Sequence, residues 1–321
     1  MGGIGKSYRG IADADLISWN QDQASIIIQF QRSDTQQQLK IILSRTAKKE
    51  LWVNETKVPQ KELVGTLNEV LFSPDDLQLI KGSPSQRRRF LDLELSQTSA
   101  LYYNQLSMYN RALQQRNFIL REQAGSRKIS LGEWDTQLAE TGSYLIKKRL
   151  AGLKKLNLLL DLMNRRLTGG KENLRITYEQ PYSDGELLVE PADLLAKLQE
   201  TLPIDRRRQS TTIGPHRDDL GFFSGAADLR KYGSQGQQRT AVLSLKLSEL
   251  EFIKSETTEY PILLLDDVMS ELDEKRREKM VVFFRNKNIQ TFITATDASM
   301  FDNIEGASLY NVSSGNAEAM K

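Results

Sequence analysis

Short apolar runs separated by polar turns are typical of an antiparallel β-sheet in the first part of the chain. Three short runs rich in β-branched and aromatic residues occupy positions 26–30, 39–43 and 51–53. Turn-forming residues follow the first run at 33–34 and the third at 54–55, which is the pattern of strands joined by tight turns. Residues 60 to about 95 then carry short helical pieces separated by proline and glycine.

The middle of the chain, from residue 97 to 168, has the periodicity of helices and contains no proline. Leucine and methionine recur mostly every three or four positions between Leu138 and Leu167, which places them on one face of a helix. Gly125-Ser126 interrupts this region, and Gly169-Gly170 is typical of a helix end. The pattern predicts two antiparallel helices in a helical lobe, and such a stripe is more typical of an ordinary core than of a coiled coil.

Strand-like and helical segments alternate from residue 174 onward. The predicted strands are 174–178, 262–265 and 291–294, and the predicted helices are 191–202, 242–253 and 274–284. Strands that alternate with helices in this way indicate crossover connections and a parallel sheet. We therefore predict an α/β fold class.

The apolar run 262–265 is followed directly by Asp266 and Asp267. Two carboxylates at the end of a parallel strand lie at the sheet edge where ligands bind. Asp266 could hold Mg²⁺, which prefers oxygen ligands and substrate phosphates, and Asp267 could orient or deprotonate a water molecule. A strand that ends in a polar turn has the same pattern, so the motif alone leaves both interpretations open.

A second motif begins with GSQG at 233–236 and runs to Thr240, directly before a predicted helix. Glycine frees the backbone, and the unpaired N–H groups at a helix N-terminus attract anions. Ser234 could add a hydroxyl donor, although a plain N-cap would have the same sequence. The motif precedes Asp266 by 32 residues (266 − 234), which leaves room for one helix and one strand. The two motifs together favour a phosphate site.

Composition excludes several classes of chemistry. The 321 residues contain 44 Lys+Arg, 42 Asp+Glu, one histidine and no cysteine. A thiolate nucleophile, a disulfide scaffold and a site with several histidine ligands are therefore excluded. No apolar run approaches the roughly 20 residues that span a bilayer, and the first ten residues have no secretory apolar segment. We expect a cytoplasmic protein with no membrane partner.

Short basic clusters interrupt this balanced charge. They lie at 87–89, 147–149, 154–155, 165–166 and 206–208. Basic side chains that contact phosphates give salt-dependent binding without sequence preference. Arg87, Arg88, Arg206 and Arg207 are therefore candidates for DNA contact, although each cluster could also be a solvated helix face and 87–89 could brace the fold.

Several motifs in order resemble an ABC-type ATPase head. They are GSQGQQ at 233–238, LLLDD at 263–267, SELD at 270–273 and ITATD at 293–297. The amino-acid sequence of three segments, 71–92, 214–219 and 267–276, resembles that of the RecF family of bacterial DNA replication and repair proteins. This resemblance covers essentially the whole chain. It implies a P-loop NTPase-like α/β head with an antiparallel β subdomain and an inserted helical lobe.

The resemblance also implies three parts. Residues 1–95 would be the N-terminal part of the head with the β subdomain, residues 96–205 a mainly helical lobe, and residues 206–321 the C-terminal part of the head. In that last part, Asp266 would be the Walker B ligand of Mg²⁺ and Asp267 the catalytic carboxylate.

The remaining implied sites concern the partner head. Ser234, Gly236 and Gln237 would contact the γ-phosphate of ATP held by the opposing subunit. Ser270 and Asp273 would belong to the D-loop that couples two heads. The switch position would be Thr294 or Thr296, and the resemblance leaves open which.

Members of the family bind ATP, dimerise with the nucleotides between the heads and load onto DNA. The resemblance therefore implies a homodimer with ATP and Mg²⁺ as cofactors and with single- and double-stranded DNA, RecR and RecO as partners. The implied role is DNA replication, repair of DNA damage and the SOS response, with weak DNA-dependent ATP hydrolysis.

The printed sequence departs from the family at one motif. A phosphate-binding loop has the pattern G-x-x-x-x-G-K-[ST]. The nearest match is GGIGKS at 2–7, where the first glycine would lie before Met1. We expect residues 1–10 to follow a lost strand–loop–helix unit, through N-terminal loss or a start assigned at an internal methionine.

This departure leaves two other functions open. The chain could bind DNA or a partner without nucleotide. It could also be a metal-dependent nuclease that uses Asp266, Asp267 and Asp273, although such sites usually collect carboxylates from several strands around two metals.

Overall fold

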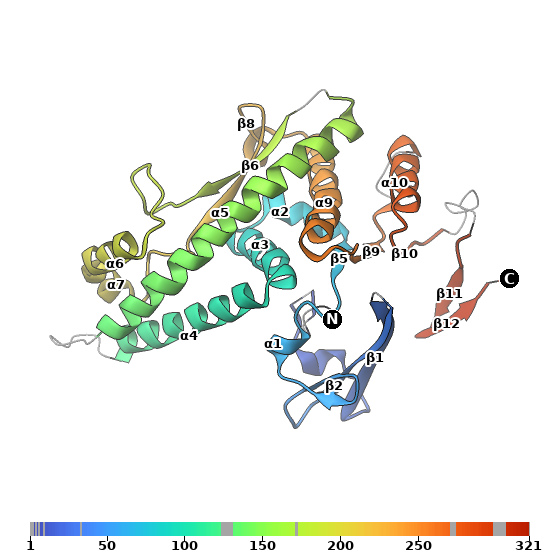
Figure 1. The fold of residues 1–321 in the computed structure, drawn as a ribbon, viewed down its shortest axis with the longest axis horizontal. Coiled ribbons are helices and arrows are strands. Elements are labelled where there is room, and N and C mark those ends of the chain that lie inside the picture. The colour runs from blue at the N-terminus through green and yellow to red at the C-terminus, as the bar shows by residue number, and fades with distance from the viewer. Residues whose placement is uncertain are drawn as a thin grey trace. The chain divides into compact units, whose positions relative to one another are not determined.

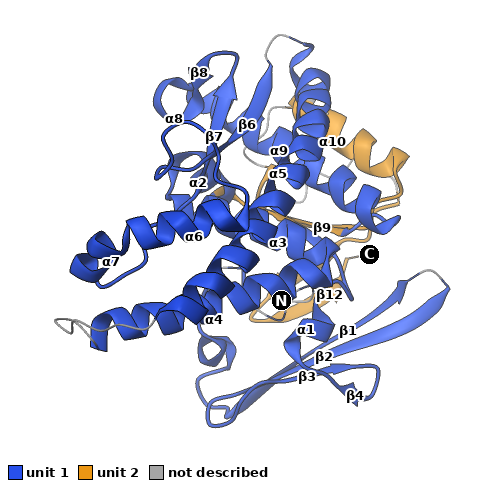
Figure 2. Ribbon diagram, turned by 60° about the vertical axis from the view of Figure 1, so that its left-hand side comes forward, with its two compact units in different colours: residues 1–70, 75–261 blue, residues 71–74, 262–321 orange. Residues whose placement is uncertain are grey.

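The computed structural model describes residues 3, 5, 7–8, 10–32, 34–122, 131–170, 173–269, 274–297 and 306–320. These residues form two compact units (Figure 2): unit 1 comprises 1–70 and 75–261, and unit 2 comprises 71–74 and 262–321. The expected boundaries near 95 and 205 stay a prediction. Five residues of the segment 1–10 lie outside the described residues, so its relation to a lost unit also stays a prediction.

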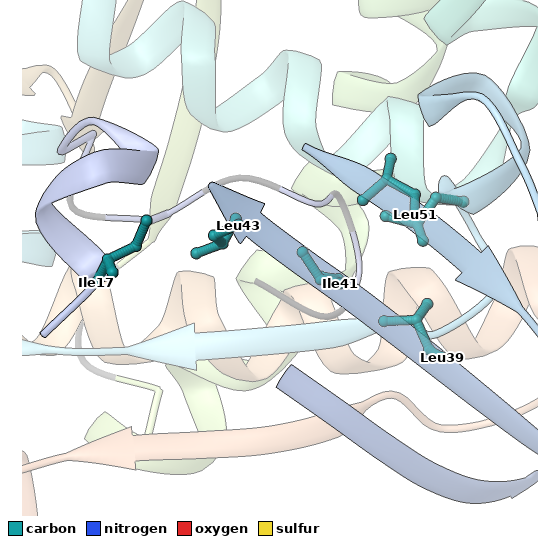
Figure 3. Close-up of a cluster of buried hydrophobic side chains, with 6 residues drawn as sticks. Ile17, Leu39, Ile41, Leu43 and Leu51 are labelled. Atoms are coloured by element: carbon teal, nitrogen blue, oxygen red, sulfur yellow. The ribbon is translucent and has the colours of Figure 1, made fainter. Parts of the chain in front are cut away.

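A four-stranded sheet with the order β1-β2-β3-β4 forms the β subdomain of unit 1. Its strands are β1 (Gln23–Arg32), β2 (Thr35–Ser44), β3 (Glu50–Val53) and β4 (Thr56–Lys57). All neighbours pair antiparallel, which confirms the three predicted strands. Alternate apolar side chains of β2 turn inward. Figure 3 shows most of the resulting buried cluster of Ile17, Leu39, Ile41, Leu43, Leu51 and Leu63.

Short elements connect this sheet to the helices. They are η1 (Asp13–Leu16), α1 (Gln60–Leu63), β5 (Glu69–Phe72), η2 (Pro74–Leu77), α2 (Gln78–Lys81) and α3 (Pro84–Thr98). The expectation of helical pieces over 60–95 missed β5. A four-residue apolar run has no periodicity that separates a strand from a buried helical turn.

Two long helices, α4 (Ala100–Glu122) and α5 (Gly132–Thr168), lie side by side in the helical lobe (Figure 1). Most of the leucine and methionine stripe of α5 is buried, including Leu145 and Leu160. The helix ends at Gly169, whose φ of 71° is the left-handed conformation that glycine adopts readily. Both helices and this C-cap were predicted. The predicted interruption at Gly125-Ser126 lies outside the described residues.

The remainder of unit 1 combines a small sheet with several helices. Its elements are β6 (Leu174–Glu179), α6 (Pro191–Glu200), α7 (Leu202–Arg208), β7 (Asp219–Ser224), β8 (Ala227–Asp228), α8 (Leu229–Tyr232) and α9 (Gln235–Thr257). Strands β6, β7 and β8 pair antiparallel. Helix α9 is buried along most of its length and packs against α5 and α3.

Unit 2 contains the predicted parallel pair, β9 (Ile262–Asp266) and β10 (Thr291–Thr294), with α10 (Glu274–Asn286) between them in sequence. The sheet order is β10-β9-β5, with residues 71–72 of β5 in this unit. A hairpin of β11 (Tyr310–Ser313) and β12 (Asn316–Ala319) follows. Within the described residues, no helix combines the length and apolar character that crossing a membrane requires.

Candidate functional site

The two aspartates follow β9 as predicted, and Thr294 ties them together. Thr294 lies opposite Asp266 in the parallel register. Its Oγ1 donates a hydrogen bond to Asp266 Oδ1 over 2.8 Å and accepts one from the N–H of Asp267 over 3.1 Å. One hydroxyl therefore fixes the orientation of the Asp266 carboxylate and the start of the loop after it.

The backbone turns sharply at Asp267. Its φ is +54°, in the left-handed region that aspartate adopts more readily than most residues but still at a cost. The next two residues, Val268 and Met269, are each only 2% exposed and anchor the loop. The exposed Asp267 side chain therefore leaves the alternation of the strand.

The second candidate threonine lies apart from this contact. Thr296 is an exposed residue in a bend two positions after β10, whereas Thr294 is the last residue of that strand and contacts both aspartates. The D-loop candidates Ser270 and Asp273 lie outside the described residues.

The GSQG motif in unit 1 forms the N-terminus of α9. Ser234 is the N-cap: its Oγ accepts a hydrogen bond from the N–H of Gln237 over 3.2 Å, and Gln237 Oε1 accepts one from the N–H of Ser234 over 3.0 Å. Such a reciprocal capping box stabilises the start of the helix. The plain N-cap considered from the sequence is therefore present, and it leaves Ser234 and Gly236 exposed at the positive end of a 23-residue helix.

Gly236 is not required by packing within the described residues. A Cβ built at this position would meet only Ser234 Oγ, at 4.0 Å. Its bare backbone instead leaves room for a ligand to approach the first helical N–H groups closely. This end of α9 fits a phosphate group.

The chemistry of the β9 edge fits Mg²⁺. This cation is usually bound by one or two carboxylates together with water and substrate phosphates. Asp266 offers a carboxylate whose orientation Thr294 already fixes. In the part of the chain that the structure describes, no three Asp, Glu or His side chains gather into a metal cage.

One DNA-contact candidate, Arg87, requires correction. Its side chain is 1% exposed, and its guanidinium bonds both carboxylate oxygens of Asp219, over 2.6 and 2.9 Å. A third bond reaches the carbonyl of Gly82 over 2.7 Å. Although burial raises the pKa of Asp219, the hydrogen bonds from Arg87 and the N–H of Leu220 bring it below its ordinary value. A DNA phosphate cannot reach Arg87, which instead braces α3 against β7.

The other basic candidates differ in exposure. Arg88 is half-buried and donates to the carbonyl of Asp218 over 2.6 Å. On α7, Arg206 is half-buried and Arg207 is exposed. The buried Asp205 anchors that helix through Arg116, over 2.6 Å. DNA contact by Arg88, Arg206 and Arg207 stays a prediction.

Comparison with known proteins gives the family. A model of the RecF/RecN/SMC N terminal domain matches residues 6–320. The chain is 46% identical over 296 residues to the DNA replication and repair protein RecF of Alkaliphilus oremlandii, covering 91% of this chain and 80% of that protein. It is 45% identical over 305 residues to RecF of Halothermothrix orenii, covering 92% and 80%. The chain belongs to the RecF family.

Two solved RecF structures share the fold. They are described as the recombination mediator protein RecF with ATPrS and with ATP in the RecFOR pathway. Their TM-scores are 0.89 and 0.91 at 33% and 32% identity, and they cover 99% and 100% of this chain and 86% of each RecF chain. The fold is therefore that of an ABC-type ATPase head, as the resemblance implied.

Proposed function

We propose that this chain is an ATP-dependent DNA-binding protein of replication and recombinational repair that acts in the cytoplasm during the response to DNA damage, including the SOS response. It binds single- and double-stranded DNA as a homodimer and works with RecR and RecO. The observation that supports this proposal most is the Asp266–Thr294–Asp267 arrangement in a chain of the RecF family. The two RecF structures described with ATP and ATPrS support the nucleotide.

In this proposal the β9 edge carries the chemistry. Asp266 holds Mg²⁺, which would neutralise charge on the phosphates, and Thr294 keeps the Asp266 carboxylate in one orientation. Asp267 orients a water molecule or accepts its proton, because its exposed carboxylate lies directly after Asp266.

The α9 N-terminus serves the opposing subunit. Ser234, Gly236 and Gln237 contact the γ-phosphate of the nucleotide held by the other head, which makes dimerisation depend on ATP. The D-loop residues Ser270 and Asp273 and a switch at Thr294 couple the two sites. These roles rest on the family pattern together with the exposed capping box.

ATP dependence of DNA binding tests the proposal. Fluorescence anisotropy would measure the affinity of the protein, isolated from its own host, for labelled single and double strands with and without ATP and Mg²⁺. We expect ATP to tighten binding to both, and Asp266→Asn to abolish that gain while leaving nucleotide-free binding intact. Equal affinity with and without ATP would instead establish nucleotide-independent binding. Nicking of a plasmid with Mg²⁺ alone would indicate a nuclease.

A further inference from the structure

A cavity of about 690 Å³ lies within unit 1, and no residue of the α9 N-terminus lines it. Its walls come from Ser7 and residues 10–13, from Lys49 and Gln60, from α3 and α4, and from Arg149 of α5 and His216. Ligand sites in proteins typically occupy about 300 to 1,000 Å³. The cavity is therefore large enough to hold a small molecule or part of a polymer.

Charged side chains of both signs line this cavity, with positive charge in excess. The cations are Lys49, Arg88, Arg89 and Arg149, and the anions are Asp13 and Asp92. Lys49 pairs with Asp13 over 3.0 Å, and Arg149 pairs with Asp92 over 2.8 Å. Two of the four cations are thereby balanced (4 − 2 = 2), which leaves Arg88 and Arg89 as the source of the excess.

The bonds of these two arginines fix their side chains without cancelling their charge. Arg88 Nη1 donates to the carbonyl oxygen of Asp218 over 2.6 Å. Arg89 Nη2 donates to the carbonyl oxygens of Ser7 and Tyr8 over 3.1 and 3.2 Å. Carbonyls are neutral acceptors, and each guanidinium has five N–H donors. Both arginines therefore keep donor capacity and a full positive charge at the cavity.

Arg88 lies among charges of both signs. Burial, followed by the charge of Arg149, lowers the pKa of Arg88, even though Asp219, Asp218 and Asp92 act in the opposite direction. Two of these carboxylates are already engaged, Asp219 with Arg87 and Asp92 with Arg149. Asp218 accepts a hydrogen bond from Tyr178, and burial raises its pKa to about 6.

His216 contributes a neutral ring to the wall of the cavity. Its Nδ1 lies 2.6 Å from the hydroxyl of Tyr109 and its Nε2 lies 3.1 Å from the carbonyl oxygen of Thr211. Because a carbonyl only accepts, Nε2 carries the proton and Nδ1 accepts from the tyrosine. Burial lowers the pKa of His216 to about 3, so the ring is neutral at physiological pH.

We propose that this cavity binds a phosphate group through Arg88 and Arg89. The planar guanidinium matches the oxygens of a phosphate in two-point hydrogen bonds, and two adjacent arginines at a cavity balance a phosphate's charge. The phosphate could belong to a nucleic-acid strand or to a small phosphorylated molecule. Only the nucleic-acid source rests on the proposed DNA binding.

Two probes distinguish these sources. Calorimetry would measure the affinity for pyrophosphate, and anisotropy at several salt concentrations would measure the affinity for a labelled single strand. The variants are R88Q, R89Q and their combination. The matched control is R121Q, because Arg121 is an exposed arginine on α4 outside the cavity. Each lost contact with a single strand lowers the slope of log affinity against log salt by about 0.7.

We expect the double variant to lose at least tenfold in pyrophosphate affinity and about 1.4 in salt slope for the single strand, with R121Q unchanged in pyrophosphate affinity. Loss of pyrophosphate affinity with an unchanged salt slope would assign the cavity to a small phosphorylated molecule. Unchanged binding of both probes in the double variant would overturn the proposal.

Two further measurements separate binding from folding. R89Q alone removes bonds to the two backbone carbonyls only, so its melting temperature should match the wild type while its pyrophosphate affinity falls. R88K keeps the positive charge and should retain more affinity than R88Q. If the wild type bound pyrophosphate through these arginines but bound no DNA, the proposed function would fail and the cavity would stand.

Discussion

The hydroxyl of Thr294 is the residue-scale feature on which the β9 edge depends. It donates to Asp266 and accepts from the N–H of Asp267, so one atom orients the carboxylate that is proposed to hold Mg²⁺ and fixes the start of the loop after it. Removing an outer partner of a metal ligand typically costs 10- to 100-fold in metal affinity or activity.

We therefore predict that Thr294→Val, which keeps the shape but removes the hydroxyl, raises the Mg²⁺ concentration needed for half-maximal ATP hydrolysis by at least about tenfold. A magnesium titration of the hydrolysis rate measures this. Thr296→Val is the matched control, because Thr296 lies beyond β10. A larger effect at Thr296 than at Thr294 would place the switch at the other threonine.

Three consecutive arginines show what a sequence can and cannot give at this scale. Successive residues of a helix point about 100° apart, so Arg87 is buried, Arg88 half-buried and Arg89 exposed on α3. The sequence pattern alone could not decide which of them faces the core, because the partner Asp219 is 132 residues away. Similarly, the aspartates at the end of β9 were predictable, but the contact with Thr294 depends on strand register.

The element scale is where buried charge holds the fold together. The Arg87–Asp219 pair joins α3 to β7, and Arg230 also contacts Asp219 over 3.1 Å. Removing one partner of a buried pair usually costs about 3–5 kcal/mol. Because Arg230 would remain beside Asp219, we expect the lower end of that range.

Arg87→Met should therefore lower the free energy of unfolding by about 3 kcal/mol, measured by urea denaturation. The loss should shrink in acid, because the lowered pKa of Asp219 gives stability above its unfolded pKa that disappears as pH falls. Arg121→Met on the exposed face of α4 is the control. Equal stability of the two variants would contradict the bracing role.

A second buried group joins α3, η2 and α9. Lys246 Nζ lies 3.2 Å from Asp76 Oδ1 and 3.2 Å from Glu249 Oε2, and the buried carboxyl group of Glu94 acts electrostatically on Glu249. Two buried carboxyl groups that repel each other cannot both ionise cheaply, so protonation of one of them is favoured. Burial raises the pKa of Glu94 to about 7 against the effect of Lys246, and it also raises that of Glu249. Burial and the nearby charges of Glu69, Glu94 and Glu249 raise the pKa of Tyr8, so this tyrosine and Glu69 also face the group.

Stability should therefore fall as pH rises from about 4.5 to about 7, since the folded state holds a proton that the unfolded chain has released. Glu94→Gln needs no such proton. Its free energy of unfolding should therefore fall less over this pH range than that of the wild type, by a difference on the order of 2 kcal/mol. Urea denaturation across this range measures it, with the exposed Glu133→Gln as control. An unchanged slope in Glu94→Gln would show that Glu94 does not hold this proton.

Several elements could be predicted because their patterns are strong. Strands β1, β2 and β9 and helices α4 and α5 have clear periodicity or length. Strand β5 was missed because it has only four residues. Strand β7 was missed because it begins with the buried Asp219, and a charged residue is not typical of a buried strand. Helix α9 begins at Gln235, seven residues before the predicted start at Val242 (242 − 235), because its polar first turns lack apolar periodicity and depend on the Ser234 cap.

At the scale of the whole molecule, the proposal requires two chains. Ser234 lies exposed at the start of α9, where it would meet the nucleotide of a second head. Ser234→Arg should abolish ATP-dependent dimerisation, because a long side chain would occupy the phosphate contact. Sedimentation with and without ATP measures this, and Ser18→Arg makes the same change at an exposed loop residue. Dimerisation that survives Ser234→Arg would remove α9 from the interface.

The most direct test of an ATP-using head is the rate of ATP hydrolysis by the protein isolated from its own host, with and without DNA. The account predicts slow hydrolysis that DNA accelerates, and a fall of about 10²- to 10⁴-fold in Asp267→Asn, the range for loss of a general base. No hydrolysis by the wild type, or the same rate in Asp267→Asn, would contradict it.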